Sequence, residues 1–411
     1  MRKKDNRYGY TIFAQNEKMT EDTRVSGLNN NVTVVGPTGS GKTGGYVVPA
    51  IQNISNSLVV SDTKGQLVKR FKKELTDKGF NVVCLDFVNP RKSCGYNPLS
   101  FIRRYPSGNL REQDVLTVAK IICPALDKHE PVWDTCATGY VAFLIAYCLE
   151  AEDPKDHNMK TVCELRRAFS RKDGHIMFES WVEEHPDSFA AKKYYDVMTN
   201  RPAERMWASI EGFVSSYLEV FSCSEMDNIF NRKKCFDINE LGRKKTVVFI
   251  NQSDTDRAFD KLVNLFHAQT LQTLCSQADA NRDGRLKVPV KMILDDFASG
   301  ATIPDFDKVI SVIRSRDISV SLIIQSMTQL ETLYDHPTAI TIINNCDTIL
   351  FLGTQDRSTA EFIAYRAMKT PETILTMPRD KAYLIRNGEK AKLVDKIAPY
   401  STLPEGGDCE R

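Results

Sequence analysis

The residues at 31–50, NVTVVGPTGSGKTGGYVVPA, combine a glycine-rich turn with a lysine and a threonine. An apolar β-branched run at 32–35 leads into the turn, and Lys42 and Thr43 stand where a helix should begin. This is G-x-x-x-x-G-K-[ST] in its required context, and its backbone N–H groups and helix N-terminus can surround a phosphate chain. The segment predicts a nucleoside triphosphate site in which Lys42 reaches the β- and γ-phosphates and Thr43 binds Mg²⁺. The predicted lining is Gly36, Pro37, Thr38, Gly39, Ser40, Gly41, Lys42, Thr43 and Gly44.

A second chemical pattern lies at 290–296, where an apolar run ends in two carboxylates, Asp295 and Asp296. After a phosphate loop in the same chain, such a run is typical of a Walker B strand. We expect Asp295 to hold the Mg²⁺ shell together with Thr43, and Asp296 to polarise the attacking water. The alternative is a pair of caps at the end of a strand.

Two further groups could complete the site. Gln325 ends the next expected strand, where its amide could contact both the γ-phosphate and the water and so sense hydrolysis. Arg314 and Arg316 lie on a polar turn before that strand, and either could donate paired hydrogen bonds to phosphate as an arginine finger across a subunit boundary. The alternative for the arginines is a surface salt bridge.

The elements that must position these residues follow a β/α pattern. Strands are expected at 58–60 and 82–85, with a helix at 66–78 between them, which is typical of a parallel sheet with crossover helices. Ligands bind at the carboxyl ends of such strands, so Asp62 and Asp86 would lie on the phosphate side, or would only cap helices and loops. Pro49 is expected to end or kink the helix that begins at Lys42.

From 111 to 236 the apolar residues recur at helical spacing, with loop signals between the segments. The predicted helices are 115–122, 133–149, 161–169, 190–198 and 206–221. We expect the aromatic side chains here to form a helix-packing core rather than to stack on bases; they are Trp133, Tyr140, Phe143, Trp207, Phe213 and Tyr217.

The β/α pattern returns after the helical stretch. Strands are expected at 246–250, 319–324, 348–352 and 382–385, with a helix at 258–278. Both β/α portions must share one sheet, because the phosphate-binding strand is expected to need its acidic partner strand beside it. The prediction is therefore an α/β fold with a RecA-like P-loop domain at 1–100 and 241–411, interrupted by an all-α domain at 101–240.

Composition narrows the function classes. The 411 residues carry a net charge of +2, so no global basic excess indicates nucleic-acid binding, and any such affinity must be local or arise from several copies around a strand. Eleven cysteines without C-x-x-C pairing fit a reducing cytosol better than a disulfide framework. The longest apolar run, near 142–149, has the length of a core helix, so no transmembrane segment is expected.

Several motifs in a fixed order are more specific than any one of them. They are GPTGSGKT at 36–43, SDTKG at 61–65, YNPL at 96–99, PVKMILDDFA at 289–298, IRSR at 313–316 and QSMTQL at 325–330. The set resembles the type IV coupling proteins, the hexameric RecA-like motor ATPases of conjugation, which are similar to FtsK-type DNA pumps. The resemblance runs from about 31 to 353 and beyond. It implies an all-α domain at 101–240, and it favours Arg314 over Arg316 as the finger, because the family's arginine stands eleven residues before its glutamine.

The chain departs from that family in three places. Asp296 stands where a glutamate is usual; the shorter carboxylate can still act as a base but must sit closer to the water, which could slow hydrolysis. The segment Asp62-Thr63-Lys64-Gly65-Gln66 replaces Asp-Pro-Lys-Gly-Glu. Most members also begin with membrane-spanning helices, which this sequence does not show.

The resemblance implies an ATP- and Mg²⁺-dependent DNA translocase, acting as a homo-hexamer. Its partners would be single-stranded DNA carrying a relaxase, other relaxosome proteins, and the type IV secretion channel or a separate membrane partner. Its place would be the cytoplasmic face of the plasma membrane. The alternatives are a nucleotide-gated adaptor that recruits relaxase or protein without pumping, and an FtsK-type chromosomal DNA pump. A small-molecule kinase is disfavoured by the long distance between the two nucleotide motifs.

Overall fold

The computed structural model describes residues 7–124, 132–201, 203–253, 259–298 and 302–398. Within these ranges one sheet of nine strands forms the centre, in the order β11–β10–β9–β3–β8–β7–β4–β6–β5. The strands from β9 to β5 run parallel, and β10 and β11 add an antiparallel edge. The bounds are β3 Val32–Val35, β4 Ser57–Asp62, β5 Asn81–Asp86, β6 Thr246–Asn251, β7 Val290–Leu294, β8 Ile318–Ile324, β9 Thr348–Phe351, β10 Lys381–Arg386 and β11 Lys392–Asp395.

This order confirms the α/β prediction and corrects one part of it. The acidic strand β7 does not lie beside the phosphate-binding strand β3, because β8 lies between them and pairs with both. Each strand tip reaches the same edge, since Val35 is opposite Ile324 and Leu294 is opposite Leu322. The glutamine that follows β8 therefore stands between the phosphate loop and the two aspartates.

Helices cover both faces of the sheet, and successive strand residues point into two different cores. A hairpin of β1 (Tyr10–Ala14) and β2 (Glu17–Thr20) packs on one face. On the same face lie α1 Thr23–Ser26, α2 Val48–Gln52 and α3 Gln66–Asp77. The other helices that accompany the sheet are α11 Asp260–Asp279, α12 Phe306–Val312, α13 Met327–Tyr334, α14 His336–Asn344, α15 Arg357–Ala367 and α16 Pro371–Leu375.

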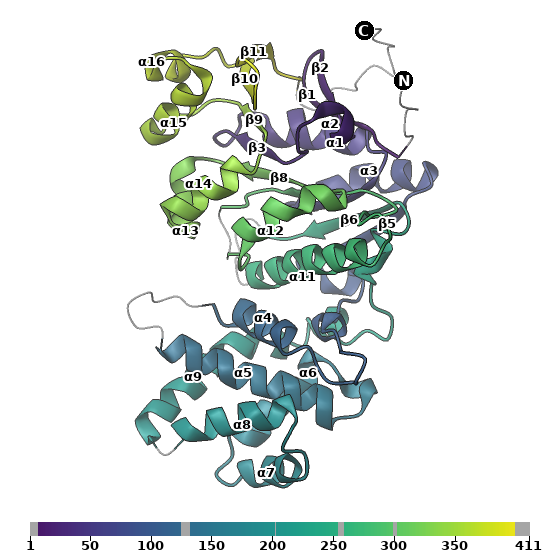
Figure 1. Ribbon diagram of the computed structural model, residues 1–411, viewed down its shortest axis with the longest axis vertical. Helices are drawn as coiled ribbons and strands as arrows, with labels where there is room; N and C mark the ends of the chain where they lie inside the picture. Colours follow the sequence, from purple (N-terminus) through teal and green to yellow (C-terminus); the bar gives the residue numbers. More distant parts are fainter. Residues whose placement is uncertain (1–6, 125–131, 202, 254–258, 299–301, 399–411) are drawn as a thin grey trace.

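The predicted helical stretch forms a separate layer at the bottom of Figure 1. Its helices are α4 Glu112–Ile122, α5 Val132–Ala151, α6 Met159–Phe169, α7 His175–Glu184, α8 Phe189–Asn200, α9 Glu204–Ser222 and α10 Asp227–Phe230. All five predicted helices are confirmed, and α7 was not predicted. Tyr140, Phe143 and Tyr217 are buried as expected, Trp133 and Trp207 pack against the core, and Phe213 is exposed. The chain also contains short 3₁₀ turns between these elements: η2 Pro90–Lys92, η3 Pro98–Phe101, η4 Pro154–Asp156, η5 Ile238–Glu240 and η6 Ile313–Arg316.

The structure corrects one sequence expectation, the helix end at Pro49, and extends another, the core run at 142–149. Pro49 does not end the helix after Lys42, because a wide π-turn, η1 Thr43–Val47, precedes it and the helix continues through α2 to Gln52. The expected core run at 142–149 belongs to α5, whose 20 residues make it, among the described helices, the one long and apolar enough to cross a membrane. Two thirds of its most apolar stretch is buried inside the protein, as in the core helix of a bundle.

A buried ion pair fixes the N-terminal hairpin to the acidic strand. Lys291, in the middle of β7, is 8% exposed, and its Nζ donates to Glu21 Oε1 at 2.9 Å and to the Thr11 hydroxyl. Asn56 Nδ2 donates to the other oxygen of Glu21 at 3.0 Å. Burial disfavours both charges, but the pair outweighs it, lowering the pKa of Glu21 and raising that of Lys291.

We predict that Glu21→Ala lowers the free energy of unfolding by about 3–5 kcal/mol, because it leaves Lys291 charged and buried without its carboxylate. Glu21→Leu combined with Lys291→Met should recover most of the loss. Chemical denaturation measures both, with Glu74→Ala as the control, since Glu74 makes an exposed ion pair with Lys78. A loss from Glu21→Ala no larger than the control's would contradict a stabilising role for the buried pair.

Candidate nucleotide site and its partner edge

The phosphate loop forms a tight turn directly after β3. Gly39 and Gly41 have φ values of +79° and +95°, where side chains are strained, and a Cβ on Gly36 would come within 2.5 Å of Ser40 Oγ. Ser40 N donates to the Pro37 carbonyl at 3.2 Å, which closes the turn. The loop therefore presents backbone N–H groups before the helix at Thr43, as the sequence predicted.

Lys42 lies folded over this loop. Its Nζ donates to the carbonyl oxygens of Gly36 at 2.6 Å and Pro37 at 3.0 Å. Burial lowers its pKa, while the nearby carboxylates of Asp295 and Asp296 act in the opposite direction. The loop, the lysine and both acidic residues thus meet at one place.

The two aspartates differ in their surroundings. Asp295 is hydrogen-bonded by Thr43, and burial together with the charge of Asp296 raises its pKa to about 6. Asp296 has φ of +51°, a left-handed conformation that places its carboxylate under Gln325, whose Nε2 donates to Oδ1 at 3.1 Å. The oxygens of Thr43 and Asp295 are of the type that Mg²⁺ prefers, and they already lie in contact.

Asp62 and Asp86 also lie at this edge, but both carboxylates accept hydrogen bonds from neighbouring backbone N–H groups. Asp62 accepts from the N–H groups of Gln66 at 3.1 Å and Val68 at 3.0 Å, at the start of α3. Asp86 accepts from Asn89 N at 2.7 Å and from the side-chain Nδ2 of Asn251 at 2.8 Å. The geometry supports the structural alternative for both residues.

Sequence reasoning missed one cation beside the loop. Lys396, just after β11, donates to the carbonyl oxygens of Ser40 at 3.4 Å and Leu352 at 2.7 Å. Burial lowers its pKa. No local motif marks Lys396, because only the antiparallel edge of the sheet brings the chain's last described segment back to the phosphate loop.

The arginines lie at the opposite edge of the sheet. Arg314 and Arg316 are in η6, which precedes β8, whereas Gln325 follows it. Seven strand residues at about 3.3 Å each separate them by roughly 20 Å or more. Neither arginine can therefore reach the phosphate loop of its own chain across the folded sheet.

The two arginines differ in their partners. Arg316 makes two hydrogen bonds to Asp279, at 2.8 and 3.1 Å, which is the salt bridge that the alternative expected. Arg314 is exposed and donates to the Gly27 carbonyl at 2.7 Å. Arg314 is thus the more readily released toward another molecule.

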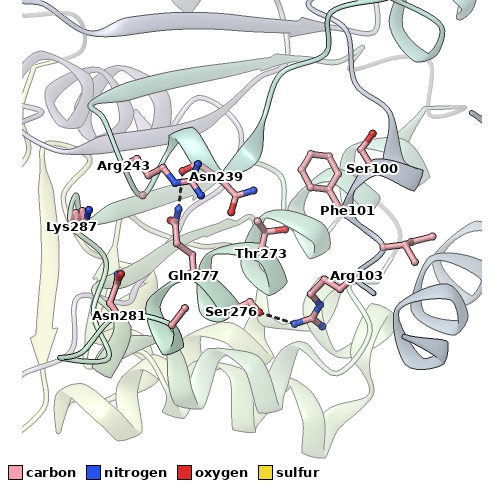
Figure 2. Close-up of a pocket in the computed structure, with 13 residues that line it drawn as sticks. Ser100, Phe101, Arg103, Asn239, Arg243, Thr273, Ser276, Gln277, Asn281 and Lys287 are labelled. Atoms are coloured by element: carbon pink, nitrogen blue, oxygen red, sulfur yellow. Dashed lines mark hydrogen bonds between the residues drawn. The ribbon is translucent and has the colours of Figure 1, made fainter. Parts of the chain in front are cut away.

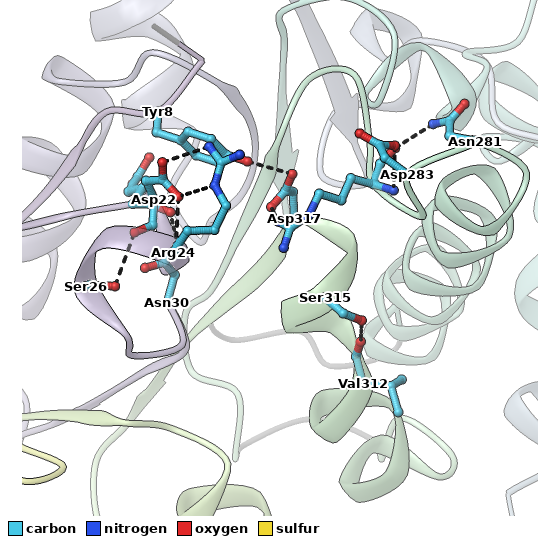
Figure 3. Close-up of polar contacts among 12 residues, drawn as sticks. Tyr8, Asp22, Arg24, Ser26, Asn30, Asn281, Asp283, Val312, Ser315 and Asp317 are labelled. Atoms are coloured by element: carbon cyan, nitrogen blue, oxygen red, sulfur yellow. Dashed lines mark hydrogen bonds and ion pairs between the residues drawn. The ribbon is translucent and has the colours of Figure 1, made fainter. Parts of the chain in front are cut away.

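A polar cluster around Asp317, the residue that follows η6, holds this turn in place (Figure 3). Asp317, left-handed at φ of +60°, accepts from the Tyr8 hydroxyl at 2.9 Å and forms an ion pair with Arg285. Arg24 lies over the Tyr8 ring at 5.2 Å and pairs with Asp22. Through these contacts the N-terminal segment holds the end of the arginine turn in place at the sheet edge.

A comparison with protein families shows to which family the chain with this site belongs. A model described as type IV secretory system conjugative DNA transfer matches residues 2–367. The chain belongs to this family. The resemblance to coupling proteins drawn from the ordered motifs is thereby confirmed.

The individual relatives of this chain are distant. Protein VirD4 of Rhizobium rhizogenes is 22% identical over 333 residues, covering 80% of this chain and 48% of that protein. Conjugal transfer protein TraG of Escherichia coli is 26% identical over 341 residues, covering 77% of this chain and 51% of TraG. The chain therefore spans about half the length of the curated relatives it matches.

The fold also has solved counterparts. The plasmid coupling protein TrwB, solved in complex with the non-hydrolysable ATP analogue ADPNP, gives a TM-score of 0.67 at 14% identity, with 89% of this chain and 84% of that chain covered. The unbound monoclinic form of TrwBdeltaN70 gives 0.69 at 14% identity, with 98% and 92% covered. At this identity the likeness establishes the RecA-like fold and carries no residue roles.

We predict that Asp295→Asn stabilises the metal-free protein at pH 7 by roughly 1–3 kcal/mol. A folded pKa of about 6 lies above the ordinary value of 3.8, so the unfolded state releases this proton first and wild-type stability falls as pH rises between these values. The advantage of the variant should therefore be absent near pH 4 and complete above pH 6. Denaturation in EDTA across pH measures it, with the exposed Asp305→Asn as control. An advantage that is larger at pH 4 than at pH 7 would contradict the assigned pKa.

Proposed function

We propose that this chain is the motor portion of a type IV coupling protein, an ATPase that assembles as a ring, hexameric when active, and drives relaxase-bound single-stranded DNA toward the secretion channel. The observation that carries the proposal is the split of the site between two edges of one sheet. The loop, Asp295, Asp296 and Gln325 meet at one edge, whereas Arg314 lies at the other. A head-to-tail ring brings one subunit's second edge to its neighbour's first edge.

In this proposal each residue has one role. Lys42 and the N–H groups of the loop bind the phosphates, while Thr43 and Asp295 hold Mg²⁺, which neutralises phosphate charge when bound. Asp296 orients and polarises the attacking water. Gln325, already hydrogen-bonded to Asp296, senses whether a γ-phosphate is present.

Arg314 from the adjacent subunit would stabilise the charge that develops on the transferred phosphoryl group. We favour it over Arg316, which is held by Asp279. The nucleotide-bound TrwB structures support a nucleotide site on this fold, including one described with ADP and Mg²⁺.

The remaining proposals concern the domains of the chain and its place in the cell. We place the nucleotide-binding domain at 1–100 and 241–411 and the all-α domain at 101–240, with the latter receiving DNA or relaxase. We place the protein at the cytoplasmic face of the plasma membrane, next to the secretion channel or a separate membrane partner. The family description, conjugative DNA transfer, supports this setting.

The test uses two variants that are expected to be inactive, each of which lacks one residue of the proposed site, at opposite edges of the sheet. Lys42→Ala removes the phosphate contact, and Arg314→Ala removes the finger, so each alone should lose at least about 100-fold of the DNA-stimulated ATP hydrolysis. In an equal mixture, roughly one site in four joins an intact loop to an intact finger, so activity should return to about a quarter of the wild-type value.

Hydrolysis is measured over a protein-concentration series without nucleic acid, with single-stranded DNA and with duplex DNA. Arg316→Ala is the matched control and should retain most activity. Absence of recovery in the mixture, or activity that is independent of Arg314, would contradict the shared site. Nucleotide-dependent binding of relaxase without any hydrolysis would establish the adaptor instead.

A further inference from the structure

A cavity lies away from the phosphate loop, where the helical layer joins the sheet (Figure 2). Its volume is about 540 Å³, within the range of small-molecule and nucleotide pockets. Four chain segments line it: 100–103, where the chain leaves the sheet for the helices, 239–243, where it returns, the C-terminal half of α11, and residues from 280 to 287 that follow this helix. An occupant would therefore touch both connections of the helical stretch at once.

The lining is cationic and polar. Arg103, Arg243 and Lys287 contribute three positive charges, and the described lining contains no carboxylate. Arg103 is neutralised by Asp114, at 2.7 Å, and donates to the Ser276 hydroxyl at 2.8 Å. Among the described residues neither Arg243 nor Lys287 has an ion-pair partner within 4 Å, so two positive charges on one side of the cavity are left without one.

The α11 helix presents an unusual face to this space. Thr273, Ser276, Gln277 and the cap residue Ala280 follow the spacing of one helical face, and none of them is a large apolar residue, whereas another face of α11 is packed in the core. Gln277 Nε2 donates to the Asn239 carbonyl at 3.0 Å. Its Oε1 is buried against Gly242 without a hydrogen-bond partner among the described residues, so it belongs to the packed wall of the cavity and not to its open space.

We propose that this cavity binds phosphate groups of a nucleotide ligand, either a segment of single-stranded DNA or a free nucleotide. Arginine and lysine charges together with serine, threonine and amide donors are the usual contacts of phosphate oxygens. Bound there, the ligand joins 100–103 to 239–243 and so fixes the helical layer relative to the sheet. The DNA form of the inference rests on the proposed function, whereas the free-nucleotide form does not.

The experiment measures fluorescence anisotropy of labelled (dT)₂₀ and of a fluorescent ATP analogue, in a Lys42→Ala background that weakens the phosphate-loop site. One test variant carries Arg243→Gln and Lys287→Gln, and a second, Thr273→Glu, places a carboxylate in the cavity. The matched control carries Arg282→Gln and Lys245→Gln, which remove the same charge outside the cavity. Thermal unfolding confirms that all variants fold.

Both test variants should weaken binding of one probe at least fivefold, with less than a twofold change in the control. If (dT)₂₀ is the ligand, the double variant should also reduce the slope of log K against log[salt] by about 1.4, for two lost phosphate contacts on a single strand. A loss confined to either probe identifies the source of the phosphate. Unchanged binding of both probes, or an equal loss in the control, would overturn the proposal. Failure of the proposed function would instead appear as absent DNA-stimulated hydrolysis in the otherwise wild-type protein.

Discussion

Parallel alignment of β3, β8 and β7 is the constraint on which the rest of this structure depends. Because all three strands end at one edge, the phosphate loop, Gln325 and the Asp295–Asp296 pair meet there without any further device. The same alignment sends the turn that carries Arg314 to the opposite edge. A single chain thus carries the proposed binding half and the proposed finger half at opposite edges and cannot join them. The proposed head-to-tail assembly would bring the finger edge of one chain to the binding edge of the next.

Two buried polar groups keep these edges in register with the rest of the molecule. Lys291 ties the middle of the acidic strand to Glu21, and Asp317 ties the arginine turn to Tyr8 and Arg285. Both connections reach the N-terminal residues, so this short hairpin region supports the acidic strand and the arginine turn alike. Such groups are costly to bury unless their partners are present, which makes the hairpin a structural requirement rather than a peripheral arm.

Local patterns in the sequence were sufficient for the residues that follow strands directly. A β-branched run before glycines, or a mainly apolar run before Asp295, predicts both the strand and the side chain at its tip. Strand order was not predictable in this way, since nothing local to β8 indicates that it lies between β3 and β7. The contacts of Lys396 and Tyr8 were not predicted, because these residues reach their partners only through long-range packing. The π-turn was not predicted, because a proline such as Pro49 favours a helix end unless the turn before it widens.

The central claim, a site completed by a neighbouring subunit, is tested most directly by an electron cryomicroscopy structure of the assembled protein with Mg²⁺, a non-hydrolysable ATP analogue and single-stranded DNA. The account predicts a closed ring in which the Arg314 guanidinium of one subunit lies within about 3 Å of a phosphate oxygen held by Lys42 of the next. A ring in which Arg314 keeps its bond to the Gly27 carbonyl and faces solvent, with the phosphates contacted by one chain alone, would contradict it.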